Sequence, residues 1–224
     1  TNSTATGNQA QATGANSTAN GNLAVASGDN SFAGGNGANA GAIGSIAIGN
    51  GAVTANGVTP SGAPSTGTSV AIGNLAMATA EDAAAFGDQA LSSGHHSTAV
   101  GGESRATATG AQAFGWQSAA TGNLSLAAGH QAMASGVQST AIGKNANASG
   151  VNASALGFAA VASAMNASAL GSGATSAFAG ATAVGFGATT TRANQVVVGG
   201  TGRSVTIGDV TASTASAPLR MRWR

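Results

Sequence analysis

Small and apolar residues recur along this chain with a period of 14 residues. A glycine marks each period, and an alanine precedes it by two positions in almost every repeat. A second alanine follows the glycine by three positions in most repeats. A fixed short period of this kind is typical of a solenoid, in which each repeat forms one coil. The glycines are Gly7, Gly21, Gly35, Gly49, Gly73, Gly87, Gly101, Gly115, Gly129, Gly143, Gly157, Gly171, Gly185 and Gly199.

Within each repeat the residues alternate with a period of two, which is the spacing of side chains on a β-strand. The alanine before the glycine points to one side, and the large residue between them points to the other. A repeat of two helices needs more than about thirty residues, whereas two strands of about five residues and two tight turns fit this period. We therefore predict an all-β solenoid of 14-residue coils, with an interior that holds little more than alanine methyl groups.

The large apolar residues directly before the glycine form an outward-facing column. An alanine interior gains little from burial, at ~25 cal/mol per Å² of apolar surface, against the entropy lost on ordering the chain. Soluble monomers rarely expose a long apolar stripe, so we expect several copies to meet on a symmetry axis. The residues predicted to form this shared core are Ile48, Ile72, Phe86, Val100, Phe114, Ile142, Leu156, Leu170, Val184 and Val198.

Two irregularities interrupt the column near the N-terminus. The first three coils carry Thr6, Asn20 and Gly34 in place of a large apolar residue, which predicts a frayed or ligand-exposed tip. The interval between Gly49 and Gly73 is longer than the others, and its additional residues include two prolines that cannot donate ladder hydrogen bonds. We expect a loop at 57–67 that leaves the rod between two coils.

The template changes after residue 190. The segment TRANQVVVGGTGRSVTIGD (191–209) follows a different spacing and is predicted to cap the last open strand edge. Residues 211–224 end in PLRMRWR and resemble no repeat, so they are expected to be disordered or foreign to the natural protein. We expect the chain to be a piece of a longer protein.

Composition narrows the function further. Charged residues make up 6% of the chain, against about a quarter in ordinary domains, and no basic patch for nucleic acid is readable in residues 1–191. There is no cysteine, so neither disulfides nor thiol chemistry are available. A hydrophobic period argues against disorder. We read neither a signal peptide nor an apolar run of membrane length in this sequence.

The sequence matches none of the catalytic or metal-binding motifs considered for it. The histidines His95, His96 and His130 have no aspartate or cysteine at ligand or triad spacing that repeats alongside them, and are expected to be solvated turn residues. Calcium-binding coils need an aspartate in every repeat, and glycine-rich phosphate loops need a following helix. We therefore expect no enzyme, no catalytic residue, no metal and no cofactor.

The position directly after the glycine changes character along the chain. In the early coils it holds Asn8, Asn22, Asn36, Asn50 and Asn74, which predicts a stacked ladder of amides.

Later in the same column come Trp116, His130, Lys144 and Phe158, which would lie side by side within about 15 Å if coils stack about 4.7 Å apart. Exposed aromatic rings beside a cation are typical of a binding hot spot, so these four are the candidate ligand-binding residues. The alternative is that the rings pack over the edge of a neighbouring subunit.

Several segments resemble the head repeats of trimeric autotransporter adhesins, the YadA-like group: SIAIGNGA (45–52), SVAIGNLA (69–76), STAVGGES (97–104) and STAIGKNA (139–146). The segment NQVVVGGTGRSVTIGDV (194–210) is similar to the neck of these proteins. The resemblance implies head repeats over residues 1–190, a neck-like adaptor over 191–210, and a left-handed parallel β-roll assembled as a homotrimer. The stalk heptads and the C-terminal membrane anchor of the family are missing from this sequence.

The resemblance also implies a function. It predicts a virulence-associated adhesin head, displayed on a bacterial surface through an outer-membrane anchor, that binds a host matrix or cell-surface protein. The alternative is a purely structural fibre or spacer without a ligand of its own. An ice-binding solenoid is a weaker idea, because its flat threonine array is lacking: the threonines in question, Thr4, Thr18, Thr98, Thr140 and Thr182, are scattered.

Overall fold

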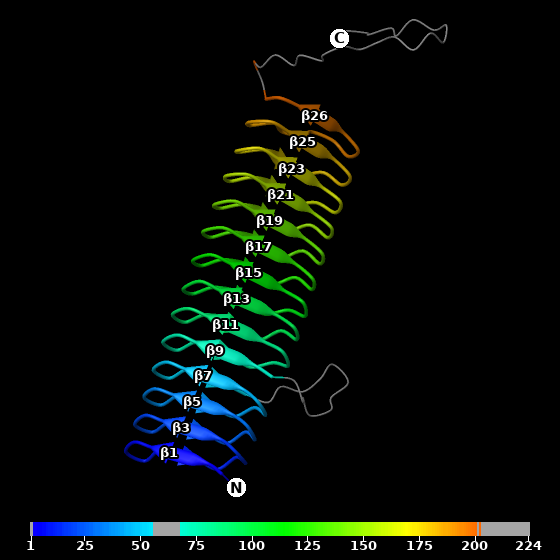
Figure 1. Cartoon of the computed structure of the whole chain (residues 1–224). Helices are drawn as coiled ribbons and strands as arrows, with labels where there is room; N and C mark the ends of the chain where they lie inside the picture. Colours follow the sequence, from blue (N-terminus) through cyan, green and yellow to red (C-terminus); the bar gives the residue numbers. More distant parts are fainter. Residues whose placement is uncertain (1, 56–67, 201, 203–224) are drawn as a thin grey trace, which may run out of the picture.

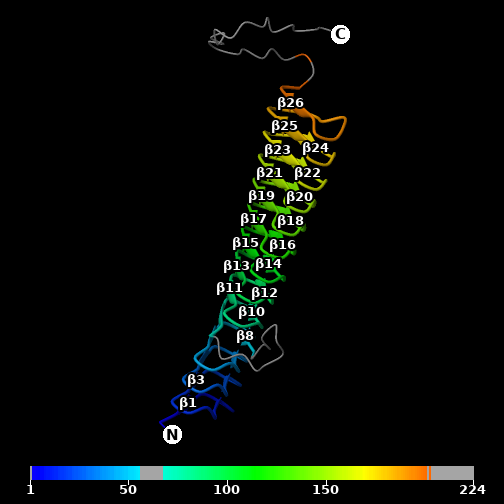
Figure 2. The ribbon, with the colours of Figure 1, turned by 90° about the vertical axis from the view of Figure 1, so that its right-hand side faces the viewer.

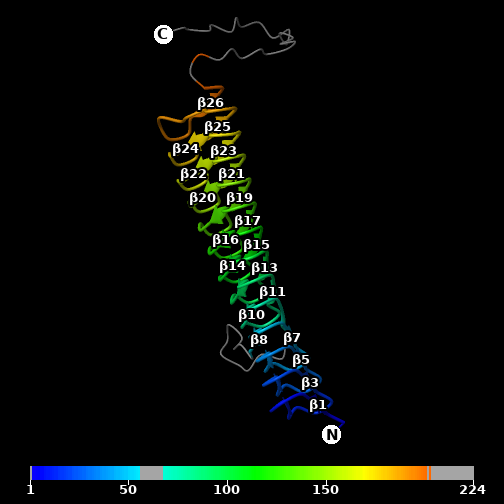
Figure 3. The same ribbon diagram turned by 90° about the vertical axis from the view of Figure 1, so that its left-hand side faces the viewer.

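The computed structural model describes residues 2–55, 68–200 and 202, which form a long stack of similar coils that starts at the N-terminus (Figure 1). Each full coil contributes one short strand to each of two parallel β-sheets. Views from either side show the two stacks of strands running side by side along the rod (Figures 2 and 3). No helix occurs among the described residues. The predicted all-β solenoid is therefore confirmed.

The first sheet has 14 strands, which follow one another in chain order. They are β1 (Thr4–Thr6), β3 (Thr18–Asn20), β5 (Phe32–Gly34), β7 (Ile46–Ile48), β9 (Val70–Ile72), β11 (Ala84–Phe86), β13 (Thr98–Val100), β15 (Gln112–Phe114), β17 (Leu126–Ala128), β19 (Thr140–Ile142), β21 (Ser154–Leu156), β23 (Ser168–Leu170), β25 (Thr182–Val184) and β26 (Val196–Val198).

The second sheet has 12 strands of two residues each. They are β2 (Gln11–Ala12), β4 (Val25–Ala26), β6 (Asn39–Ala40), β8 (Val53–Thr54), β10 (Met77–Ala78), β12 (Leu91–Ser92), β14 (Arg105–Ala106), β16 (Ala119–Ala120), β18 (Met133–Ala134), β20 (Asn147–Ala148), β22 (Val161–Ala162) and β24 (Thr175–Ser176).

The strands are shorter than the five residues predicted, because both turns of a coil take up more of the chain. Each turn contains a residue in the left-handed region, as Gln131 (φ 56°) and Gln138 (φ 56°) show for the two sides of one coil. The turns also bond from coil to coil, since the amide of Gln131 donates to the carbonyl of Trp116 at 2.9 Å. Stacking thus continues around the coil, beyond the strands.

The marker glycines are required by backbone conformation and by close stacking. Gly129 has φ 138°, a region that side chains disfavour. A Cβ built on it would lie 2.6 Å from the carbonyl oxygen of Gly143 in the next coil. Neither constraint leaves room for any other residue, which explains why the glycine returns in every repeat.

The interior of the coil is as narrow as the sequence predicts. In β7 the side chain of Ala47 is fully buried, whereas Ile46 and Ile48 on either side of it point outward and are 37% and 38% exposed. Most buried residues of the described chain are alanines, and the remainder are serines, threonines and glycines. Among the described residues, no buried side chain is larger than threonine. The core is therefore a flat slot one methyl group deep on each side.

A column of buried serines, four positions before the glycine, was not anticipated from the sequence. The hydroxyl groups of Ser17, Ser31, Ser45 and Ser97 each donate to a carbonyl three residues earlier, at 2.6–2.8 Å. These bonds satisfy both the buried hydroxyl and a turn carbonyl without adding volume, which suits a slot of this width.

The register continues through the longest interval of the repeat. Strands β7 and β9 pair with Ala47 opposite Ala71, as neighbouring coils do elsewhere. The additional residues are thus excluded from the strands. The predicted loop at 57–67 itself lies outside the described residues.

The C-terminal part of the repeat also continues the stack. Strand β26 pairs with β25 and places Val197 opposite Ala183, so residues 196–198 add a strand to the first sheet. Most of the rest of the predicted neck, and all of the tail at 211–224, lie outside the described residues. The boundary between head and neck stays a prediction.

The width of the slot gives a direct test. Ala141 lies fully buried in β19, and we expect Ala141→Leu to overpack the interior and to lower the free energy of unfolding by about 1–3 kcal/mol or more. The matched control is Ala119→Leu on the outer side of the second sheet, a column that already accepts Leu91 and Met133. Thermal or denaturant unfolding measures both, and equal stability of the two variants would contradict the narrow-slot description.

Candidate functional site

The outward side of the first sheet carries a long row of large apolar residues. We call it the apolar face and define it by the ten large residues directly before the marker glycines. Seven of them, Ile48, Ile72, Val100, Phe114, Ile142, Leu156 and Val198, are exposed in the single chain. The other three, Phe86, Leu170 and Val184, are half-buried. In-register pairing stacks these residues in consecutive coils, for example Ile142 beside Leu156. Their predicted role as a shared core between subunits remains a prediction.

The predicted amide ladder after the glycine is confirmed over three consecutive steps, from Asn22 to Asn74. The side-chain amide of Asn22 donates to Asn36 at 2.8 Å, Asn36 to Asn50 at 2.9 Å, and Asn50 to Asn74 at 3.0 Å. The ladder then ends on a carboxylate, because Asn74 donates to Asp88 at 2.7 Å. An acceptor-only group is a natural last rung, since it cannot donate onward.

The structure brings together the four candidate ligand-binding residues, here called the ring column: Trp116, His130, Lys144 and Phe158. Backbone hydrogen bonds of 2.9–3.0 Å between consecutive turns hold their coils in register. The rings of Trp116 and His130 stack, with centroids 4.7 Å apart and planes at 29°. Trp116 and Phe158 are exposed. The predicted proximity is confirmed, whereas a binding role stays a prediction.

Gly102 leaves the space that the indole of Trp116 occupies. Gly102 occupies the same column one coil before Trp116, and a Cβ on it would lie 3.2 Å from Cδ1 of the indole. The asparagine ladder stops at Asp88, so Gly102 is the first position in the column without a side chain. This gap admits the larger ring and fixes it between the Gly102 backbone and His130.

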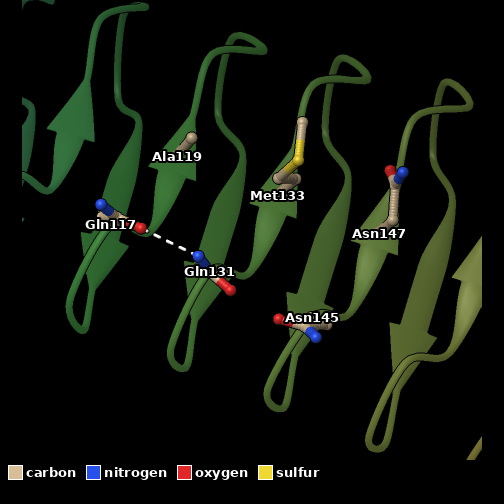
Figure 4. Close-up of a pocket in the computed structure, with 6 residues that line it drawn as sticks. All are labelled: Gln117, Ala119, Gln131, Met133, Asn145 and Asn147. Atoms are coloured by element: carbon tan, nitrogen blue, oxygen red, sulfur yellow. Dashed lines mark hydrogen bonds between the residues drawn. The ribbon is translucent and has the colours of Figure 1, made fainter.

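A shallow hollow of about 450 Å³ lies beside the ring column, on the outer side of the second sheet (Figure 4). One wall consists of the turn residues Gln117, Gln131 and Asn145, each of which directly follows a member of the ring column. The other wall consists of the strand residues Ala119, Met133 and Asn147.

The amides of this wall form a second ladder that the sequence analysis missed. Gln131 donates to Gln117 at 2.9 Å, and Gln117 donates to the carboxylate of Glu103 at 2.8 Å. These two bonds hold both glutamine side chains in place, so the wall of the hollow is ordered before any ligand arrives.

Two histidines have partners that the sequence analysis did not identify. Nδ1 of His95 lies 3.5 Å from a carboxylate oxygen of Glu81, and Nδ1 of His96 lies 3.3 Å from Asp82. The residues are 14 positions apart, so each histidine sits above the acid of the preceding coil. Both histidines lie in turns and His96 is exposed, as expected, whereas only 16% of the His95 side chain is exposed. The neighbouring acids were not predicted, and a search for acids one period before each histidine would have found them.

The described residues offer no grouping of three or more histidine, cysteine, aspartate or glutamate side chains that could hold a metal ion. The part of the chain that the structure describes also contains no helix able to span a membrane.

Comparison with known proteins identifies the repeat. The family model "YadA head domain repeat (2 copies)" matches residues 1–24, 12–38, 26–52, 68–90, 92–118, 120–146 and 148–174, which together are more than half of the chain. A comparison with curated protein sequences gives no match. Among solved structures, the chain is similar to the crystal structure of the collagen-binding domain of the Yersinia adhesin YadA. The identity is 22% and the TM-score 0.30, and the match covers 91% of this chain and 77% of that one.

The YadA head is a left-handed β-roll, which agrees with the all-β parallel solenoid described above. The matched spans follow one another along the stack and resume at residue 68, after the long interval between Gly49 and Gly73. The chain therefore belongs to the family of YadA head repeat proteins.

Proposed function

We propose that this chain is the head of a homotrimeric bacterial adhesin that binds a host matrix or cell-surface protein without catalysing a reaction. Membership of the YadA head repeat family supports an adhesin of the autotransporter type. We also propose that the head is displayed on a bacterial surface through an outer-membrane anchor. A cofactor has no part in the proposal, and neither does nucleic acid.

The observation that carries the self-association is the apolar face. Ten coils contribute a large apolar side chain to it, while the interior of the described coils buries nothing larger than threonine. Most of the side-chain burial that a soluble protein needs is thus missing from the single chain. A parallel neighbour with the same coil spacing would cover the face along its whole length, and closure about a threefold axis would leave no copy with its face in water.

The ring column is our proposed contact surface for the ligand. Repetitive coils offer nearly the same backbone everywhere, so a selective contact must come from the positions that differ. The column supplies two exposed rings and the only charged residue between Ala106 and Thr191, Lys144. The adjoining hollow adds ordered amides. Three copies of such a patch would raise the apparent affinity through multivalency. Collagen is the first ligand to test, because the similar solved domain is described as collagen-binding.

The test is binding of the oligomer to immobilised collagen and other matrix proteins at physiological salt. We expect Trp116→Ala combined with Lys144→Ala to weaken binding by about tenfold or more, since exposed aromatic and cationic anchors carry most of the energy of an interface. Mass and melting temperature of the oligomer should stay unchanged. Met77→Ala combined with Arg105→Ala is the matched control, because it removes one apolar and one cationic side chain elsewhere on the exposed surface.

A second variant separates the placement of the indole from its presence. Gly102→Asn would put a side chain where the indole now lies, and asparagine already occupies this column at Asn74. We expect it to displace Trp116, to change tryptophan fluorescence and to weaken binding.

Dissociation of the oligomer by the double variant of Trp116 and Lys144 would instead assign the rings to the subunit interface. Unchanged binding would move the site to the polar N-terminal tip or to residues 57–67, and no binding by the parent protein would leave a spacer.

A further inference from the structure

A second apolar surface lies on the turn that leads from the second sheet back to the first. Val137, Val151 and Met165 occupy the same turn position in three consecutive coils and are 43%, 44% and 56% exposed. Leu124 and Phe178 flank them and are exposed as well. We call these five residues the apolar edge. It lies on the side of the coil opposite to the ring column, because the two turns of a coil connect opposite ends of its strands.

The apolar edge is a continuous stripe. The backbone N–H of Asn152 donates to the backbone carbonyl of Val137 at 2.9 Å. In the next coil, the backbone N–H of Asn166 donates to the carbonyl of Val151 at 2.8 Å. These bonds stack the three turns directly on one another. Closer to the N-terminus, the same column holds Asp29, Glu81, His95 and Thr109, with Ile43 as an apolar exception. The apolar stripe is therefore confined to the C-terminal half of the rod.

Charge is depleted from the same half of the rod. Residues 106–191 contain a single charged side chain, Lys144, which belongs to the ring column on the other side. Depletion of charged residues is the compositional mark of the centre of a protein interface, and large exposed apolar patches on soluble proteins mark contact sites. The apolar edge thus has the character of a covered surface.

The period of the stripe selects its partner. Its side chains repeat once per coil, at about 4.7 Å, along a rod. A second copy of this chain has the same spacing, so side chains of the two copies could stay in register over several coils, whereas a partner of another period would lose register. The edge also spans the coils in which the apolar face carries Ile142, Leu156 and Leu170. In each of these coils two outward residues, such as Asn152 and Ser154, stand between the two surfaces in sequence.

We infer that the apolar edge is a lateral contact to a second copy of the chain, which lies parallel alongside it. The contact extends the shared core from the apolar face around one side of the roll. The polar column in the N-terminal half leaves that side open to water. This inference rests on the self-association in the proposed function and assigns the residues of its flank.

The first experiment places charge on the edge. Val151→Asp combined with Met165→Asp fits the coil itself, because the same column accepts Asp29 and Glu81. The matched control is Thr109→Asp combined with Asn123→Asp, two further positions of that column in consecutive coils. We expect the first pair to weaken association about tenfold or more, the consequence of burying unpaired charge, and the control to leave it unchanged. Sedimentation at a series of concentrations measures both.

A thiol probe tests the edge without destabilising it. The chain has no cysteine, so Val151→Cys and Thr109→Cys each introduce a unique thiol. In the oligomer we expect the thiol at position 151 to react with a polar maleimide about tenfold more slowly than the thiol at position 109, because a neighbouring copy covers it. In denaturant the two rates should be equal.

The outcomes separate this inference from the proposed function. Equal labelling rates in an oligomer of unchanged mass would overturn the inference and leave the proposed trimer standing. Fast labelling at position 151 that becomes slow only after a matrix protein is added would also overturn it, since the edge would then belong to the ligand. A parent protein that is monomeric would contradict both the lateral contact and the proposed homotrimer.

Discussion

The narrow interior of the coil is the constraint on which the rest of this structure depends. Two short strands lie so close together that only alanine, serine and threonine fit between them, and the turn glycines lie almost against the next coil. Backbone hydrogen bonds between coils and small buried hydroxyl groups can stabilise such a stack, but apolar burial within one chain cannot contribute much. Large apolar side chains are consequently placed outside the coil, where only another molecule can cover them.

A repeat that fixes the interior leaves function to the outward columns. The position after the marker glycine illustrates this: asparagines join the first coils through side-chain hydrogen bonds, Asp88 ends the ladder, and Gly102 opens the space that Trp116 fills. Beyond that point rings and a cation replace the amides. The same position in the coil therefore forms a column of hydrogen-bonded polar side chains near the N-terminus and a candidate contact surface further along the rod.

The 14-residue period was sufficient to predict the coils, the buried alanines and the outward column, because a residue such as Ile48 has no alternative side to face once Ala47 fills the slot. It overestimated the length of the strands, since a left-handed residue such as Gln131 is needed in each turn. It missed pairs that join different columns or residue types, such as His96 with Asp82. The handedness came from the resemblance, because alternation along a strand is the same in either hand.

The central claim is that the fold of one chain is completed by its neighbours, and the concentration dependence of unfolding tests it most directly. Thermal unfolding, followed by circular dichroism over about a hundredfold range of protein concentration, should give a midpoint that rises with concentration, because dissociation and unfolding are then coupled. Sedimentation below the midpoint should show an oligomer. A midpoint independent of concentration, together with the mass of a single chain, would contradict the account, since a lone coil stack would then be stable with its apolar face in water.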